Sequence, residues 1–159
     1  MILKEQKSLK ISIEFVLDDA EGSLNFITPP SGRENWSDCY LYTINHSTPV
    51  WFPCVQSSNE LCTWKIEVSV RKEHTAIVSG DLIEKIADKD DPNKEVYHFF
   101  LSTPTNAMNI GLVVGTFDSI NHEIMNEISS FCEPKLVSLL SHTTGFVHEV
   151  SDKNLTLNK

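Results

Sequence analysis

The sequence predicts a mainly β fold, an antiparallel β-sandwich followed by a C-terminal α-helix. Two observations predict the sheets: apolar residues recur at every second position in several segments, and Gly, Pro, Asn, Asp and Ser cluster between these segments. A third observation predicts the helix, because the apolar residues change to helical spacing after position 133. The pattern is typical of short strands joined by turns, with one helix after the last strand.

The first half of the chain contains four expected strands. Residues 9–17 alternate, with one apolar face made by Leu9, Ile11, Ile13, Phe15 and Leu17. Residues 24–28 and 39–44 are strand-like and are separated by a loop over 29–38 that is rich in Pro, Gly and Ser. The clearest strand covers residues 62–70, and its inward face is expected to carry Cys62, Trp64, Ile66, Val68 and Val70.

The second half predicts a hairpin, a further strand and the helix. Gly80 is an expected bend, and the polar turn over 87–95 predicts a hairpin that joins residues 82–86 to 96–101. Residues 108–117 form the next expected strand, in which Gly111 and Gly115 indicate close backbone approach. Pro134 suits the first helical position, and helical spacing follows through Leu136, Leu139, Leu140, Thr143, Val147 and Val150. We therefore expect a β domain over residues 1–132 and the start of a helical domain over 133–159.

Composition and charge disfavour two classes of binding partner, nucleic acids and membranes. The 159 residues include 22 acidic and 13 basic side chains, giving a formal net charge of −9. An acidic surface repels nucleic-acid phosphates, so direct DNA contact is not expected. The chain has no run of apolar residues long enough to span a membrane, and its first residues do not resemble a signal peptide. These features predict an intracellular protein that binds no membrane.

The cysteine and histidine patterns do not predict a catalytic or metal site. The four cysteines have irregular spacing without a C-x-x-C pair, which favours packed thiols over zinc ligands. A zinc peptidase helix needs HExxH, but Asn126 follows His122-Glu123 and Asp152 follows His148-Glu149 where the second His belongs. The aspartates of the 87–95 turn lack the glycine and closing glutamate of a calcium loop. An independent zinc or thiol protein using Cys54 and Cys62 is the remaining alternative of this kind.

Several ordered segments resemble the N-terminal β domain of the zinc aminopeptidases related to leukotriene A hydrolase. The segment WFPC, followed by a strand with TWK, is similar to the FPC…ATF signature of that family, and later segments resemble its TP and VVGxF stretches. The resemblance gives a structural role to Trp51, Phe52, Pro53, Cys54, Cys62, Trp64, Thr103, Pro104, Gly115 and Phe117. It also implies a sandwich that is incomplete at its start, which should leave an unpaired edge or an exposed apolar patch.

One branch of this family is more similar to the chain than the working peptidases are. Gln56 stands where the peptidases have an acidic residue, whereas the SSNELCTWK segment and the HTTGFVHEV segment resemble the aminopeptidase-like branch found in the general transcription factor TFIID. That resemblance implies a nuclear, non-catalytic scaffold without metal, cofactor or small-molecule substrate. Its implied partners are other TFIID subunits, with promoter DNA contacted only through the full complex. The alternative is the N-terminal β domain of an active zinc aminopeptidase.

Overall fold

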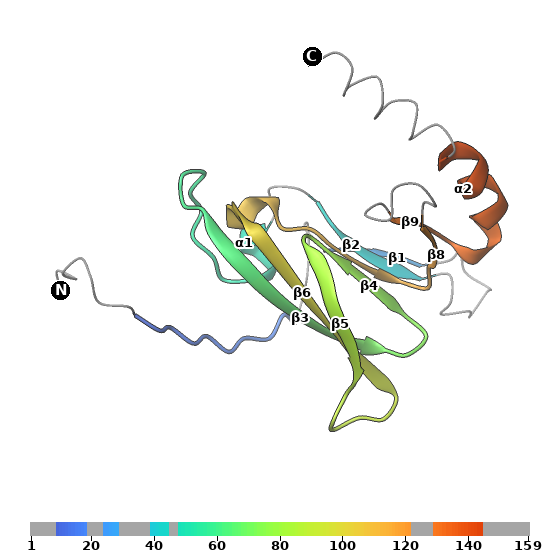
Figure 1. Ribbon diagram of the computed structural model, residues 1–159. Coiled ribbons are helices and arrows are strands. Elements are labelled where there is room, and N and C mark those ends of the chain that lie inside the picture. The colour runs from blue at the N-terminus through green and yellow to red at the C-terminus, as the bar shows by residue number, and fades with distance from the viewer. Residues whose placement is uncertain (1–8, 19–23, 29–38, 45–47, 122–128, 145–159) are drawn as a thin grey trace, which may run out of the picture.

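A computed structural model of the chain describes residues 9–18, 24–28, 39–44, 48–121 and 129–144. Two antiparallel sheets form its centre (Figure 1). The first has the order β1-β2-β7-β4, with β1 at Leu24–Ile27, β2 at Tyr40–Thr43, β7 at Leu112–Gly115 and β4 at Thr75–Val78. The second has the order β3-β6-β5, with β3 at Cys62–Arg71, β6 at Lys94–Thr105 and β5 at Asp81–Ala87. The mainly β, antiparallel prediction is therefore confirmed.

The core lies between these two sheets. Ala76 and Val78 of β4 cluster with Tyr97 and Phe99 of β6, and all four are buried. Alternate side chains of β3 and β7 pack around this cluster, namely Ile66, Val68, Val70, Leu112 and Val114. Since each strand turns every second side chain inward, the apolar periodicity of the sequence becomes the inner layer of a sandwich.

The hairpin formed by β5 and β6 agrees with the expected one. Its register pairs Leu82 with Phe99 and Ile86 with Val96. Gly80 precedes β5 with a φ of +110°, which confirms the expected bend. A Cβ atom built on this residue would lie 2.8 Å from the backbone nitrogen of Leu101, so the position requires glycine.

Short helical segments connect the sheets and end the described chain. The helix α1 covers Thr48–Trp51 and contacts η2, a 3-10 turn at Ala107–Asn109. A second turn, η3 at Pro134–Leu136, leads into α2 at Val137–Thr144 and begins with the expected proline. Val147 and Val150 lie outside the described residues, and the division at position 132 stays a prediction. No helix among the described residues combines the length and apolar character needed to cross a membrane.

The predicted strand over residues 9–17 is wrong. These residues belong to no strand, and the apolar side chains at 9, 11, 13, 15 and 17 are exposed. Figure 1 shows the segment, in blue, outside the paired strands. Period-two alternation creates a face that can be buried, but a strand also needs a neighbouring edge to which its backbone can hydrogen-bond.

Three further elements differ from the sequence predictions. The expected strand over 108–117 is shorter, because Met108 belongs to η2 and β7 begins only at Leu112. The hairpin of β8, Asp118–Asn121, and β9, Ser129–Cys132, was not predicted. The helix α1 was also missed, since four residues that include a proline carry no detectable helical period.

Candidate functional site

Three aromatic side chains meet where α1 ends and β3 begins. The Trp51 and Phe52 ring centroids are 4.6 Å apart at an interplanar angle of 75°, and those of Phe52 and Trp64 are 5.9 Å apart at 74°. The backbone N–H of Phe52 donates to the carbonyl of Thr48 at 3.1 Å, which fixes Phe52 against the end of α1. We call Trp51, Phe52 and Trp64 the aromatic cluster. The cluster joins the WFPC segment to the TWK segment, which are the two parts of the sequence that resemble the FPC…ATF signature.

Trp64 is held across the sheet by a hydrogen bond. Its Nε1–H donates to the Thr105 carbonyl at 2.8 Å. The register of β3 against β6 is irregular at this point, because Cys62 faces Thr105 while Trp64 faces Leu101. The extra residues on β6 include Thr103 and Pro104, and proline has no N–H to give to a ladder. The Thr105 carbonyl that accepts the indole hydrogen bond therefore lies next to this irregularity.

Two hollows flank Trp64. The smaller has a volume of about 300 Å³ and is lined by the aromatic cluster with Lys65, Ile66, Glu67 and Ile110. The larger has a volume of about 580 Å³ and is lined mainly by the 53–62 segment, with Ile11, Trp64 and Ala107. Glu67 and Ile110 were not among the residues proposed from the sequence. The exposed position of Glu67 on an alternating strand is visible in the sequence, but its place beside the cluster depends on the fold.

The cysteines lie apart from any metal-binding arrangement in the described part of the chain. All four are free thiols, and no group of three or more His, Cys, Asp and Glu side chains is placed to hold a metal ion among the described residues. Burial raises the pKa of the Cys54 thiol, which keeps it protonated and weakly nucleophilic. The inward position expected for Cys62 is wrong, because its side chain is exposed. The residue lies next to the register irregularity between Cys62 and Trp64. His122 and His148 lie outside the described residues.

The remaining motif residues lie at a second place. Gly115 is buried between Tyr40 and Phe117, whose ring centroids are 6.1 Å apart. A Cβ atom on Gly115 would lie 2.6 Å from the Cβ of Tyr40 and 2.9 Å from the ring of Phe117. The close approach expected at this glycine is confirmed, whereas the one expected at Gly111 is wrong, because a Cβ there would meet its nearest neighbour at an ordinary 3.7 Å. Neither Gly115 nor Phe117 lines the hollows beside Trp64, so the motif residues do not converge on one site.

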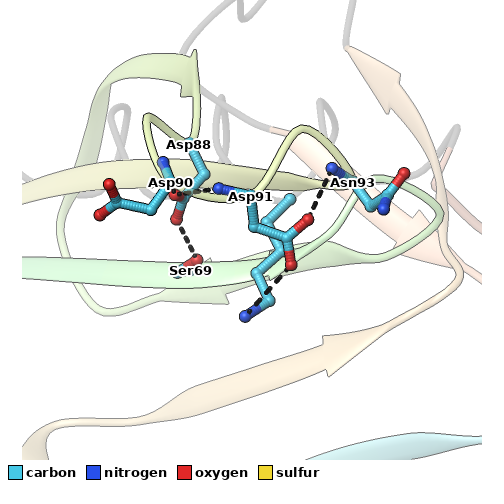
Figure 2. A network of polar contacts seen from close by, with 6 residues as sticks. Ser69, Asp88, Asp90, Asp91 and Asn93 are labelled. Atoms are coloured by element: carbon cyan, nitrogen blue, oxygen red, sulfur yellow. Dashed lines mark hydrogen bonds and ion pairs between the residues drawn. The ribbon is translucent and has the colours of Figure 1, made fainter.

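In the acidic turn between β5 and β6, aspartate carboxylates accept hydrogen bonds from backbone N–H groups of the same turn (Figure 2). Asp88 accepts backbone N–H bonds from Asp90 at 2.9 Å and Asp91 at 3.1 Å, and a hydroxyl bond from Ser69 at 2.9 Å. These donors, with the Asp90 N–H contributing most, lower the pKa of the Asp88 carboxyl below its ordinary value. Asp91 in turn accepts from the backbone N–H of Asn93 at 2.9 Å. The arrangement is a hairpin turn, as the sequence indicated.

Comparison with known proteins finds relatives that are similar to this chain over most of its length. No family model matches the chain. Transcription initiation factor TFIID subunit 2 of Gallus gallus is 41% identical over 149 residues, which cover 92% of this chain and 13% of that protein. The chain is homologous to a segment of TFIID subunit 2. The Danio rerio protein of the same name is 39% identical over 149 residues, covering 92% of the chain and 12% of the relative. The Drosophila melanogaster protein is 36% identical over 153 residues, with 93% and 12% covered.

The homology confirms the resemblance to the TFIID branch. It extends over nearly all of the described fold, yet the chain spans only about an eighth of the length of TFIID subunit 2 in these animals. The wider resemblance to the zinc aminopeptidases has no matching relative among these three and stays a prediction. By its name, TFIID subunit 2 is a transcription initiation factor in each of the three species.

Proposed function

We propose that this chain is a scaffold module of the general transcription factor TFIID, without catalytic activity of its own, and acts in RNA polymerase II promoter recognition and preinitiation complex assembly. The observation that carries the proposal is the identity of 36–41% to TFIID subunit 2 across more than nine tenths of the chain. A TFIID subunit works in the nucleus beside the other subunits, so these are the proposed partners and the proposed location.

The charge of the chain supports contact with protein rather than with DNA. A net charge of −9 gives phosphates little attraction. The strand β5 offers a different kind of surface, because Leu82 and Ile83 are 50% and 62% exposed at the edge of the second sheet. Apolar side chains on a free strand edge favour association with another protein. Promoter DNA is then reached only through the full complex.

Co-purification from nuclear extract tests the proposal. We expect a tagged full-length protein that contains this segment to bring down the other TFIID subunits in stoichiometric amounts. Replacing Leu82 and Ile83 by Asp should reduce this recovery, whereas Lys89→Asp in the polar turn serves as a matched charge control. Absence of TFIID subunits from the purified material, together with zinc-dependent release of N-terminal amino acids from peptides, would overturn the scaffold proposal in favour of an active aminopeptidase.

A further inference from the structure

The smaller hollow beside β3 has the walls of an aromatic box. Trp51 and Trp64 each meet the Phe52 ring nearly at right angles, at 75° and 74°, and all three line the same space of about 300 Å³. All three side chains are partly exposed, so the space opens to the surface. Its volume is at the lower end of the range of small-ligand sites, roughly 300–1,000 Å³.

The chemistry of this hollow favours a cation with no N–H groups. Aromatic faces carry negative charge density and attract cations, and boxes of aromatic rings bind quaternary ammonium groups. Such a group buries its methyl groups against the rings and leaves no donor without a partner. An unmodified lysine ammonium has three donors, and the hollow offers it mainly carbon atoms. Losing water without replacement hydrogen bonds would therefore disfavour the unmodified side chain.

The charges near the hollow agree with a cationic ligand. Glu67 lies along the hollow, but its side chain alternates to the outer face of β3, where its Oε1 lies 3.5 Å from the Nδ1 of His98. Lys65 lines it too, but its Nζ lies 6.0 Å from the centroid of the Phe100 ring, where it is already engaged. The net charge of −9 adds a long-range attraction for basic segments.

The strand beside the hollow can hold an extended chain. In the described part of the molecule β3 pairs with β6 on one side, and no strand pairs with its other edge. The β3 residues from Trp64 to Glu67 line the hollow. A peptide that hydrogen-bonds to this edge would therefore place a side chain into the aromatic box. The indole N–H of Trp51 is buried and has no hydrogen-bond partner among the described residues.

We propose that the hollow formed by Trp51, Phe52 and Trp64 binds a trimethylated lysine side chain presented by an extended basic peptide. The peptide main chain lies along the free edge of β3, and the quaternary ammonium enters the aromatic box. This inference rests on the geometry of the hollow and does not depend on the proposed role in TFIID.

Tryptophan fluorescence titration of the 159-residue chain tests the ligand. The probe is a short extended basic peptide with one central trimethyllysine, compared with the same peptide carrying unmodified lysine and with one carrying the neutral tert-butyl isostere. We expect the trimethylated peptide to bind roughly tenfold more tightly than either comparator. Equal affinity for the neutral isostere would overturn the cation–π basis. Choline binding as tightly as the peptide would overturn the assignment to a peptide ligand.

Matched variants test the site. Trp51→Leu and Phe52→Leu should each lower the affinity about tenfold or more, with the fold checked by the midpoint of urea unfolding. The control is Glu84→Gln, because Glu84 lies on β5 and does not line the hollow, so this variant should leave the affinity for the trimethylated peptide unchanged. A loss in Glu84→Gln as large as in the aromatic variants, or unchanged binding in both aromatic variants, would overturn the proposal.

Discussion

At the scale of one residue, the backbone conformation at position 80 requires glycine. Its φ of +110° disfavours any side chain, and a Cβ would lie within 2.9 Å of the Phe100 carbonyl atoms. We expect Gly80→Ala to lower the free energy of unfolding by about 2 kcal/mol or more, measured by urea denaturation. Gly111→Ala is the matched control, since its Cβ would meet the nearest side-chain oxygen at an ordinary 3.7 Å. Equal destabilisation by both changes would contradict this account.

Asp88 gives a residue-scale prediction that depends on pH. Because three donors hold its pKa below the ordinary value, the folded protein binds its proton less readily than the unfolded chain. The stabilisation is complete above the pKa of the unfolded carboxyl, near pH 4, and is lost as the pH falls through the lower folded pKa. We expect Asp88→Asn to lower the urea midpoint at pH 7, with a smaller difference from the parent at pH 3. A difference that does not change with pH would show that the carboxylate charge has no role.

Residue environments could be predicted from the sequence only where they follow from local geometry. The bend at Gly80 and the close approach at Gly115 follow from the special backbone of glycine, and both are confirmed. The inward position of Cys62 was wrong, because strand alternation continues through a register irregularity that the sequence does not reveal. The contact of Trp64 with the Thr105 carbonyl lies next to that same irregularity and could not be inferred.

At the scale of elements, strands with a close partner in sequence were the most predictable. The β5–β6 hairpin has a polar turn that marks its register, and β3 has nine alternating residues that match its buried face from Trp64 onward. Residues 9–17 alternate just as well but have no strand partner in the described part of the chain. The spacing of apolar residues indicates which face of a strand can be buried. The pairing of that strand with another depends on residues far away in the sequence, which a local pattern does not contain.

This difference between the two alternating segments leads to a prediction. Ile13 is 60% exposed, whereas Val68 packs against the core between the sheets. We expect Ile13→Asp to change the free energy of unfolding by no more than about 0.5 kcal/mol, and Val68→Asp to lower it by several kcal/mol because a charge would enter the core. Chemical denaturation followed by circular dichroism measures both. A large loss in Ile13→Asp would mean that residues 9–17 are packed in solution.

At the scale of the molecule, the two sheets depend on one shared core. Its four buried members come from β4 of the first sheet and β6 of the second, so neither sheet can bury its inner face alone. This dependence explains why fold class was easier to predict than topology: apolar faces on many strands require two layers. The pairing of β2 with β7, whose sequences lie far apart, is not encoded in any local pattern.

The shared core predicts that the sheets unfold together. Phe99 is 6% exposed and stacks at 6.3 Å against Tyr97 while packing on the Ala76 and Val78 side of the core. Phe99→Ala should lower the free energy of unfolding by about 3–5 kcal/mol through the lost transfer energy and the cavity left behind. Because the cavity would lie between the layers, amide hydrogen exchange should accelerate in β2 and β7 as much as in β3. Phe26→Ala on β1 is the control, since that side chain is 65% exposed and its loss should cost less than about 1 kcal/mol. Faster exchange confined to β3, β5 and β6 would show instead that the second sheet opens alone, and that the first is stable without it.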